Sequence, residues 1–96
     1  MGNYKLTKEA EADLDRIWLY GLEHWGVAEA DKYYNALFQR FEELAETPLL
    51  YPTVDDIREG YRRSVCGVDS IYYRINGDTV EIMSILGKQN TDEALN

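Results

Sequence analysis

The chain has 96 residues, a length that predicts one domain over residues 1–96. Because 45% of the residues are hydrophobic, we expect this domain to fold rather than to be disordered. Its one cysteine, Cys66, excludes an internal disulfide and a cysteine-based zinc site, and a reducing, cytoplasmic location is expected. The net charge of −8 argues against direct, specific binding of nucleic acid, and no apolar run approaches the length of a membrane span.

The first predicted elements are a short strand and a long helix. Tyr4-Lys5-Leu6 alternates apolar and polar residues and Thr7 is a favoured N-cap, so we expect a strand followed by a helix over residues 8–24. Gly26 stands where a left-handed residue would end this helix. Leu19 lies opposite the apolar stripe of the helix. The stripe, in which both tryptophans are expected to be packing anchors, consists of Leu14, Ile17, Trp18, Gly21 and Trp25.

A second helix is predicted by a longer stripe of apolar residues at steps of three and four. Pro48 biases Thr47 away from the helical region and so ends this helix. The link between the two helices is short, which predicts an antiparallel helical hairpin. The stripe consists of Ala30, Tyr33, Tyr34, Leu37, Phe38, Phe41, Leu44 and Ala45.

The C-terminal part of the chain is predicted to form an antiparallel meander. Residues 48–60 contain both prolines and no sustained period, which is typical of a loop. Three strand-like runs follow, and a two-residue turn is expected at Asn76-Gly77 because both positions tolerate positive φ. The runs are Tyr61–Cys66, Ser70–Ile75 and Thr79–Leu86.

The order of these elements predicts an α+β fold, with the N-terminal strand and the helical hairpin packed on a C-terminal antiparallel sheet. Simple alternation places Val80, Ile82 and Leu86 on one side of the last strand. Met83 and Ile85 would then lie on its other side. A strand that is apolar on both sides needs a second cover or offers a surface to a partner.

Several segments, in order and at matching spacing over about residues 4–86, resemble the ParE branch of the RelE/ParE toxin superfamily. The resemblance implies a RelE/ParE-like fold and the toxin of a type II toxin–antitoxin system. It further implies a cognate antitoxin as partner, DNA gyrase as the target, and action by binding without a catalytic residue, cofactor or metal. The segments are Leu6-Thr7-Lys8-Glu9-Ala10-Glu11-Ala12-Asp13-Leu14, Ile17-Trp18, Trp25-Gly26, Leu44-Ala45-Glu46-Thr47-Pro48, Ile57-Arg58-Glu59-Gly60-Tyr61-Arg62, Ile71-Tyr72-Tyr73-Arg74 and Ile82-Met83-Ser84-Ile85-Leu86.

The expected contacts follow from the basic residues of the C-terminal third and from the last strand. Acidic antitoxin segments would suit these arginines, although Arg62 and Arg63 should point to opposite faces of their strand. The residues expected to contact the target are Arg74, Leu86 and Lys88. Those expected to contact the antitoxin are Leu19, Arg58, Arg62, Arg63, Tyr73, Arg74, Met83 and Ile85.

Two alternatives remain open at the level of sequence. A ribosome-dependent mRNA interferase would need basic residues and a late Tyr or His for proton transfer, whereas the one histidine, His24, falls at the helical turn. A degenerate toxin would bind only its antitoxin. The acidic charge favours this second alternative, and so do two departures from the family pattern, at Gly67-Val68-Asp69 and after Leu86.

Overall fold

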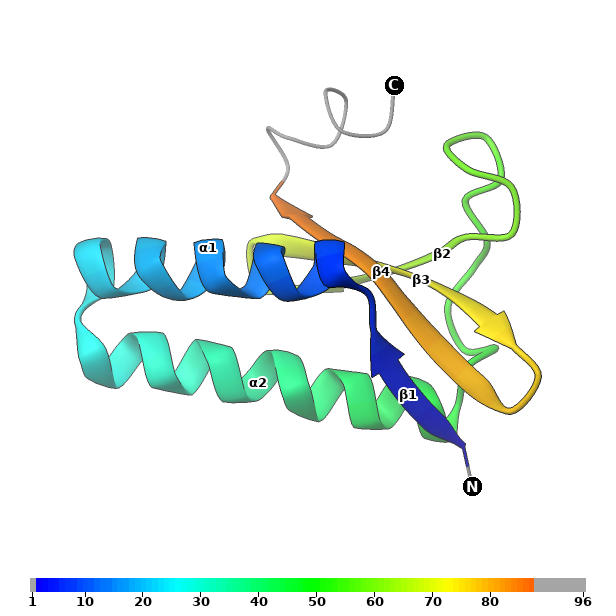
Figure 1. Ribbon diagram of the computed structural model, residues 1–96, viewed down its shortest axis with the longest axis horizontal. Coiled ribbons are helices and arrows are strands. Elements are labelled where there is room, and N and C mark those ends of the chain that lie inside the picture. The colour runs from blue at the N-terminus through cyan, green and yellow to red at the C-terminus, as the bar shows by residue number, and fades with distance from the viewer. Residues whose placement is uncertain (1, 88–96) are drawn as a thin grey trace.

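The computed structural model describes residues 2–87 and contains two helices and one four-stranded sheet (Figure 1). The elements in chain order are β1 (Asn3–Leu6), α1 (Lys8–Trp25), α2 (Val27–Glu46), β2 (Arg62–Cys66), β3 (Asp69–Asn76) and β4 (Thr79–Gly87). The strands lie in the order β1-β4-β3-β2; β1 is parallel to β4, and the other neighbours are antiparallel. This arrangement confirms the predicted α+β class.

The start of α1 is fixed by Thr7, as its sequence predicts. The Thr7 Oγ1 accepts a hydrogen bond from the Ala10 amide at 3.0 Å and lies 3.0 Å from the Met83 carbonyl, to which it can donate. One side chain therefore caps the helix and ties it to β4. The helix ends before Gly26, whose φ of 88° confirms the expected glycine stop.

Both helices bury one stripe against a single face of the sheet. Figure 1 shows α1 and α2 running side by side as the predicted hairpin. Neither helix is long and apolar enough to cross a membrane. The fully or nearly fully buried members of the core are Ala10, Leu14, Ile17, Leu37, Phe41, Leu44, Cys66, Ile71, Tyr73, Val80, Ile82 and Ile85.

A β-bulge at Met83 interrupts the alternation of β4. In the register with β3, Tyr72 pairs with Ser84 while the next residue, Tyr73, pairs with Ile82. Met83 is thus the extra residue of β4, without a cross-strand partner. Because the side-chain period of a strand is two, one extra residue exchanges the two faces for everything that follows.

The bulge overturns the predicted distribution of the apolar residues of β4. Ile85 was expected opposite Val80 and Ile82, but it joins them in the core under the helices. Leu86 was expected with that pair, but it lies in a separate cluster on the other face of the sheet. The prediction from strict alternation was therefore wrong for both residues.

The second face of the sheet is covered in part by the chain itself. Val54, Tyr72 and Leu86 form a small buried cluster there, and Ile57 and Tyr61 pack against it. The loop between α2 and β2 supplies three of these five side chains. The predicted loop therefore covers part of the second apolar face of the sheet, for which the sequence predicted either a cover or a partner.

The hairpin between β3 and β4 is displaced by one residue from its expected position. Asn76 is the last paired residue of β3 and faces Thr79, so the two-residue turn is Gly77-Asp78 rather than Asn76-Gly77. Gly77 has a φ of 66°, and among the described residues every positive φ belongs to a glycine. A positive φ at the first turn position alone is the pattern of a type II′ turn.

Side chains of α1 occupy the edge of β4 where β1 has ended. The amide of Ile85 donates to Asp13 Oδ2 at 2.9 Å, and Arg16 Nη2 donates to the Ile85 carbonyl at 2.9 Å. Desolvation raises the pKa of Asp13, although the bond from Ile85 and the charge of Arg16 oppose that shift. These two side chains take the main-chain groups that an additional strand would use.

The outer edge of β2 is covered in a similar way. Arg40, a residue of α2, donates to the Val65 carbonyl at 2.8 Å. Partner binding is consequently expected in side-chain grooves rather than by strand addition at these positions.

Candidate functional site

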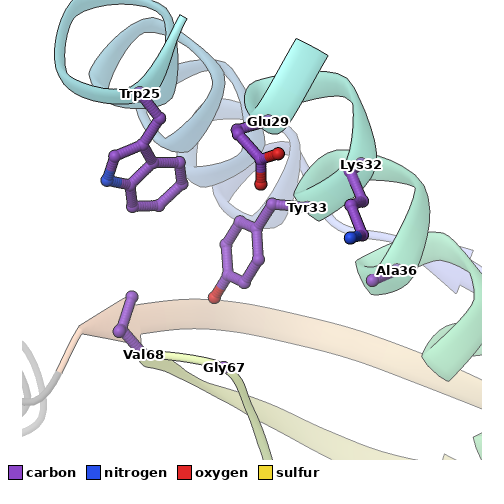
Figure 2. Close-up of a pocket in the computed structure, with 7 residues that line it drawn as sticks. All are labelled: Trp25, Glu29, Lys32, Tyr33, Ala36, Gly67 and Val68. Carbon is purple, nitrogen blue, oxygen red and sulfur yellow. The ribbon is translucent and has the colours of Figure 1, made fainter.

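A concave surface lies between the tip of the helical hairpin and the turn that joins β2 to β3. We call it the tip groove; its volume is about 680 Å³. Figure 2 shows the rings of Trp25 and Tyr33 side by side above the turn. The groove is lined by Trp25, Glu29, Lys32, Tyr33, Ala36, Gly67 and Val68.

Tyr33 joins the helical wall of the tip groove to the turn. Its hydroxyl lies 2.7 Å from Asp69 Oδ2 and 2.8 Å from the Cys66 carbonyl, so its proton can be donated to either acceptor. Burial, followed by the Asp69 carboxylate, raises the pKa of Tyr33 well above its ordinary value. Gly67 has a φ of 62°, and a Cβ there would lie 2.3 Å from Tyr33 Cε1. The turn therefore packs directly on the ring.

Trp25 is not the core anchor that its position on the helical stripe predicts. It is 39% exposed, and its ring packs edge to face against Tyr33 at 5.5 Å and against Tyr20 at 5.8 Å. The reason is that the buried residues of α1 end at Gly21, one turn earlier. Trp18, by contrast, is partly buried and packs edge to face against Tyr34, in agreement with a packing role.

Many of the exposed apolar side chains lie around this end of the molecule, while Leu49 and Leu50 are exposed in the loop after α2. Those near the tip come from the last turns of α1, the first residue of α2, the end of β2 and the β2–β3 turn, and they include Leu19, which is 56% exposed. A concentration of this kind is typical of a protein-binding surface. The side chains are Leu19, Tyr20, Trp25, Val27, Val65 and Val68.

A second groove, of about 440 Å³, lies where the N-terminus of α1 meets β4 and the end of the long loop. We call it the sheet-face groove. It brings together three of the residues expected to bind partners, namely Arg58, Met83 and Leu86. The complete lining is Thr7, Lys8, Glu9, Arg58, Tyr61, Met83, Ser84 and Leu86.

The other predicted basic residues do not join Arg58 in one cluster. Arg62 donates to the Tyr51 carbonyl, whereas Arg63, the next residue along the strand, is exposed on the opposite face, as its alternation predicts. Arg74 is paired with Glu81, and this bond lowers the pKa of the Glu81 carboxyl. Arg74 is thus already neutralised within the chain.

Tyr73 and Ile85 are the two predicted contact residues whose side chains reach no surface. Both have 0% exposure, and the Tyr73 hydroxyl donates to the Pro48 carbonyl at 2.8 Å. The bulge turns Ile85 inward, and the same face of β3 turns Tyr73 toward the helices. They can affect binding only indirectly, by packing beneath the residues at the surface. Lys88 lies outside the described residues.

The sequence did not indicate the tip groove as a site. Its wall depends on the contact between Tyr33 and Gly67, which are far apart along the chain, and on the exposure of Trp25. One signal was available: Tyr20, Trp25 and Tyr33 place three aromatic rings close to the hairpin turn, more than a short turn needs to pack.

No group of three or more His, Cys, Asp or Glu side chains in residues 2–87 could hold a metal ion. His24 stacks on Tyr20 with ring centroids 3.9 Å apart, and its Nδ1 lies 2.9 Å from the Tyr20 carbonyl. The histidine has a local packing partner at the end of α1. The tip groove is lined mainly by apolar and aromatic groups, whereas the sheet-face groove combines apolar residues with polar and charged ones.

Comparisons with known proteins agree with this fold and identify the family. The family described as ParE toxin of the type II toxin–antitoxin system, parDE, matches residues 4–91. Toxin ParE1 of Caulobacter vibrioides is 40% identical over 86 residues, covering 90% of this chain and 88% of the relative. Toxin ParE1 of Mycobacterium tuberculosis is 32% identical over 84 residues, covering 86% of each.

A solved structure shows the same fold. It is titled as a chromosomal ParDE toxin–antitoxin system from P. aeruginosa, and it superposes with a TM-score of 0.79 at 22% identity, covering 91% of this chain and 96% of that chain. The match of the family over residues 4–91 and the identity to two curated toxins extend well beyond a shared fold. The chain therefore belongs to the ParE toxin family of type II toxin–antitoxin systems.

Proposed function

We propose that this chain acts in the cytoplasm as a toxin that inhibits DNA gyrase and is neutralised by a cognate antitoxin. The observation that carries the proposal is the family match over residues 4–91. The relatives that are most informative are themselves named as ParE toxins, and the solved neighbour is titled as a ParDE system. A toxin of such a system needs a partner that holds it inactive.

The two grooves support inhibition by binding. The tip groove offers exposed rings and aliphatic side chains, and the sheet-face groove offers apolar residues beside two cations, Lys8 and Arg58. Surfaces of this kind bury apolar area against a partner and select it by charge. Among the described residues of the proposed antitoxin contact, Leu19, Arg58, Arg63 and Met83 are at least partly accessible. Arg62 and Arg74 are accessible too, but Arg62 is bonded to the Tyr51 carbonyl and Arg74 is paired with Glu81.

Gyrase inhibition is tested with the purified chain, purified gyrase and supercoiled DNA. We expect accumulation of gyrase-cleaved DNA, and we expect Lys88→Glu or Leu86→Asp to reduce it more than Gln39→Glu does, since Gln39 is an exposed residue of α2 that lines neither groove. A chain that is toxic in cells but leaves gyrase unaffected would redirect the proposal to another target. Cleavage of translated transcripts would then favour an mRNA interferase.

Antitoxin binding is tested by co-purification with the product of a short reading frame adjoining the gene. We expect a stable heteromeric complex that survives gel filtration. A complex formed by a chain that leaves growth unaffected would identify a degenerate toxin that has kept only its antitoxin contact. Absence of any complex would contradict the proposed pairing.

A further inference from the structure

We propose that the sheet-face groove binds an acidic polypeptide segment of a partner protein, with an aliphatic side chain against Met83 and Leu86 and a carboxylate between Lys8 and Arg58. The inference rests on the proposed function in one respect, because the antitoxin would be the natural source of such a segment. It deepens that function by naming the chemistry of the contact.

The apolar part of the groove is adaptable. Met83 is the bulge residue of β4; it is half-buried and has no cross-strand partner. Its unbranched thioether side chain can change rotamer to fit a bound side chain. Leu86 is 7% exposed and Tyr61 is partly buried, so both form a firm base next to it. A single inserted aliphatic side chain fits a surface of this size and composition.

The charged part of the groove is provided by cations that the chain leaves unpaired. Neither Lys8 nor Arg58 has a side-chain hydrogen bond or ion pair among residues 2–87, whereas Lys5 and Arg74 share Glu81 and Arg16 pairs with Asp13. In a chain of net charge −8, two cations left free beside one groove are available to an external carboxylate.

The preference for an acidic segment rests on the two cations. The groove lies at the N-terminus of α1, where the helix dipole adds partial positive charge, but Glu9 and Glu11 of the first turn offset it. Glu9 is the one acidic lining residue, so the lining carries a net positive charge. Association with an acidic segment is therefore favoured over association with a basic one.

A polar group within the groove is also available. The Ser84 hydroxyl lines the groove and makes no hydrogen bond to another described residue. It can donate to a carboxylate or main-chain carbonyl of the bound segment. By contrast, the charged residues of the tip groove, Glu29 and Lys32, balance each other, so that surface does not select a sign of charge.

The test is an NMR titration of the full ¹⁵N-labelled chain with two capped hexapeptides, one of alternating Glu and Leu and one of alternating Lys and Leu. We expect the Glu-Leu peptide to shift the amide signals of Lys8, Arg58, Met83 and Leu86. The Lys-Leu peptide is expected to leave them in place. Raising the salt concentration from 0.05 to 0.5 M is expected to weaken binding, because the two cations lie at an exposed rim.

Two variants that each change the net charge by −1 make the test specific. Arg58→Gln is expected to weaken binding of the Glu-Leu peptide about tenfold, whereas Gln39→Glu, at an exposed site of α2 outside both grooves, is expected to change the Kd by less than about twofold. The ¹⁵N spectrum of each variant reports whether it is folded. Met83→Asp, which places a carboxylate in the apolar part, should also abolish the shifts.

Several outcomes would overturn the inference. They are no shifts with the Glu-Leu peptide, equal binding of both peptides, equal loss of affinity in the Arg58→Gln and Gln39→Glu variants, shifts confined to the tip groove, or self-association of the chain that Met83→Asp removes. None of them involves growth or gyrase, so a failure here leaves the toxin proposal intact. Conversely, peptide binding by a chain without toxicity would support the groove and contradict the toxin.

Discussion

Two neighbouring buried tyrosines differ in whether the hydroxyl group has a hydrogen-bond partner. Tyr72 and Tyr73 are neighbours on β3, and both are fully buried. The Tyr73 hydroxyl donates to the Pro48 carbonyl at 2.8 Å and so ties the long loop to the sheet. The Tyr72 hydroxyl lies under the same loop and has no hydrogen-bond partner among the described residues. A buried polar group in that state costs stability.

The two tyrosines provide a matched pair of variants. Tyr72→Phe removes an unpaired hydroxyl and is expected to leave the free energy of unfolding unchanged or to raise it by about 1 kcal/mol. Tyr73→Phe removes a hydrogen bond and leaves the Pro48 carbonyl unpaired, so it is expected to lower that free energy by about 1 kcal/mol. Urea unfolding of the wild type and both variants measures the difference. Equal destabilisation by both changes would contradict the assignment.

Glu81 is the residue whose titration should be visible in the stability of the protein. Hydrogen bonding from Arg74 lowers the pKa of its carboxyl below the ordinary value of 4.5. The charged form is therefore favoured in the folded state, and its stabilising contribution is complete above pH 4.5 and is lost as the pH falls through the lowered pKa.

Replacing the carboxyl by an amide tests this linkage. Glu81→Gln is expected to be less stable than the wild type at pH 7, and the difference between the two proteins should shrink as the pH falls below 4.5. Thermal unfolding across pH 3–7 is the measurement. Glu42→Gln, at an exposed position of α2, is the control. A difference that stays constant over this range would contradict the coupling to Arg74.

At the scale of elements, the turn between β2 and β3 is held by a contact that tolerates only glycine. Gly67 directly follows β2 and Gly77 directly follows β3, and their φ angles are positive, at 62° and 66°. A Cβ at Gly67 would collide with the Tyr33 ring, while a Cβ at Gly77 would meet no atom within 4 Å. The two positions therefore separate the cost of backbone strain from the cost of the collision.

Alanine substitutions at these glycines measure the two costs. Gly77→Ala is expected to destabilise the protein by about 1 kcal/mol through backbone strain alone. Gly67→Ala is expected to cost about 3 kcal/mol, because displacement of Tyr33 is added to the strain. Chemical unfolding reports both values. Equal losses for the two variants would mean that the Tyr33 ring does not rest on the turn.

The elements themselves were largely predictable, because each has a local signal. Thr7 and Gly26 mark the ends of α1, and the stripe of α2 has the period of a helix over its whole length. The position of the bulge was not predictable, since a bulge at Met83 is a property of cross-strand register rather than of the period of one strand. The one-residue displacement of the β3–β4 turn has the same origin.

The candidate site was predictable only in part. Arg58, Met83 and Leu86 were chosen from charge and apolar pattern, and the fold places them in one groove. Tyr73 was chosen in the same way but lies in the core. The exposure of Trp25 depends on where the sheet stops covering α1, which no local pattern records.

For the whole molecule, we propose that the chain is harmful alone and harmless with its partner. The fold leaves two grooves and exposed apolar side chains, many of them around the tip groove, that a partner could cover. Exposed apolar surface promotes aggregation of a protein that works by itself, whereas a protein that is kept in a complex can bury this surface against its partner. The family match over residues 4–91 indicates that this partner is an antitoxin.

Growth of bacteria expressing the chain from an inducible promoter tests the claim most directly. Cells would carry the chain alone, the chain with the product of the adjoining short reading frame, or that product alone. We expect arrested growth with the chain alone and normal growth in the other two cultures. Normal growth with the chain alone, at protein levels confirmed by immunoblot, would contradict it.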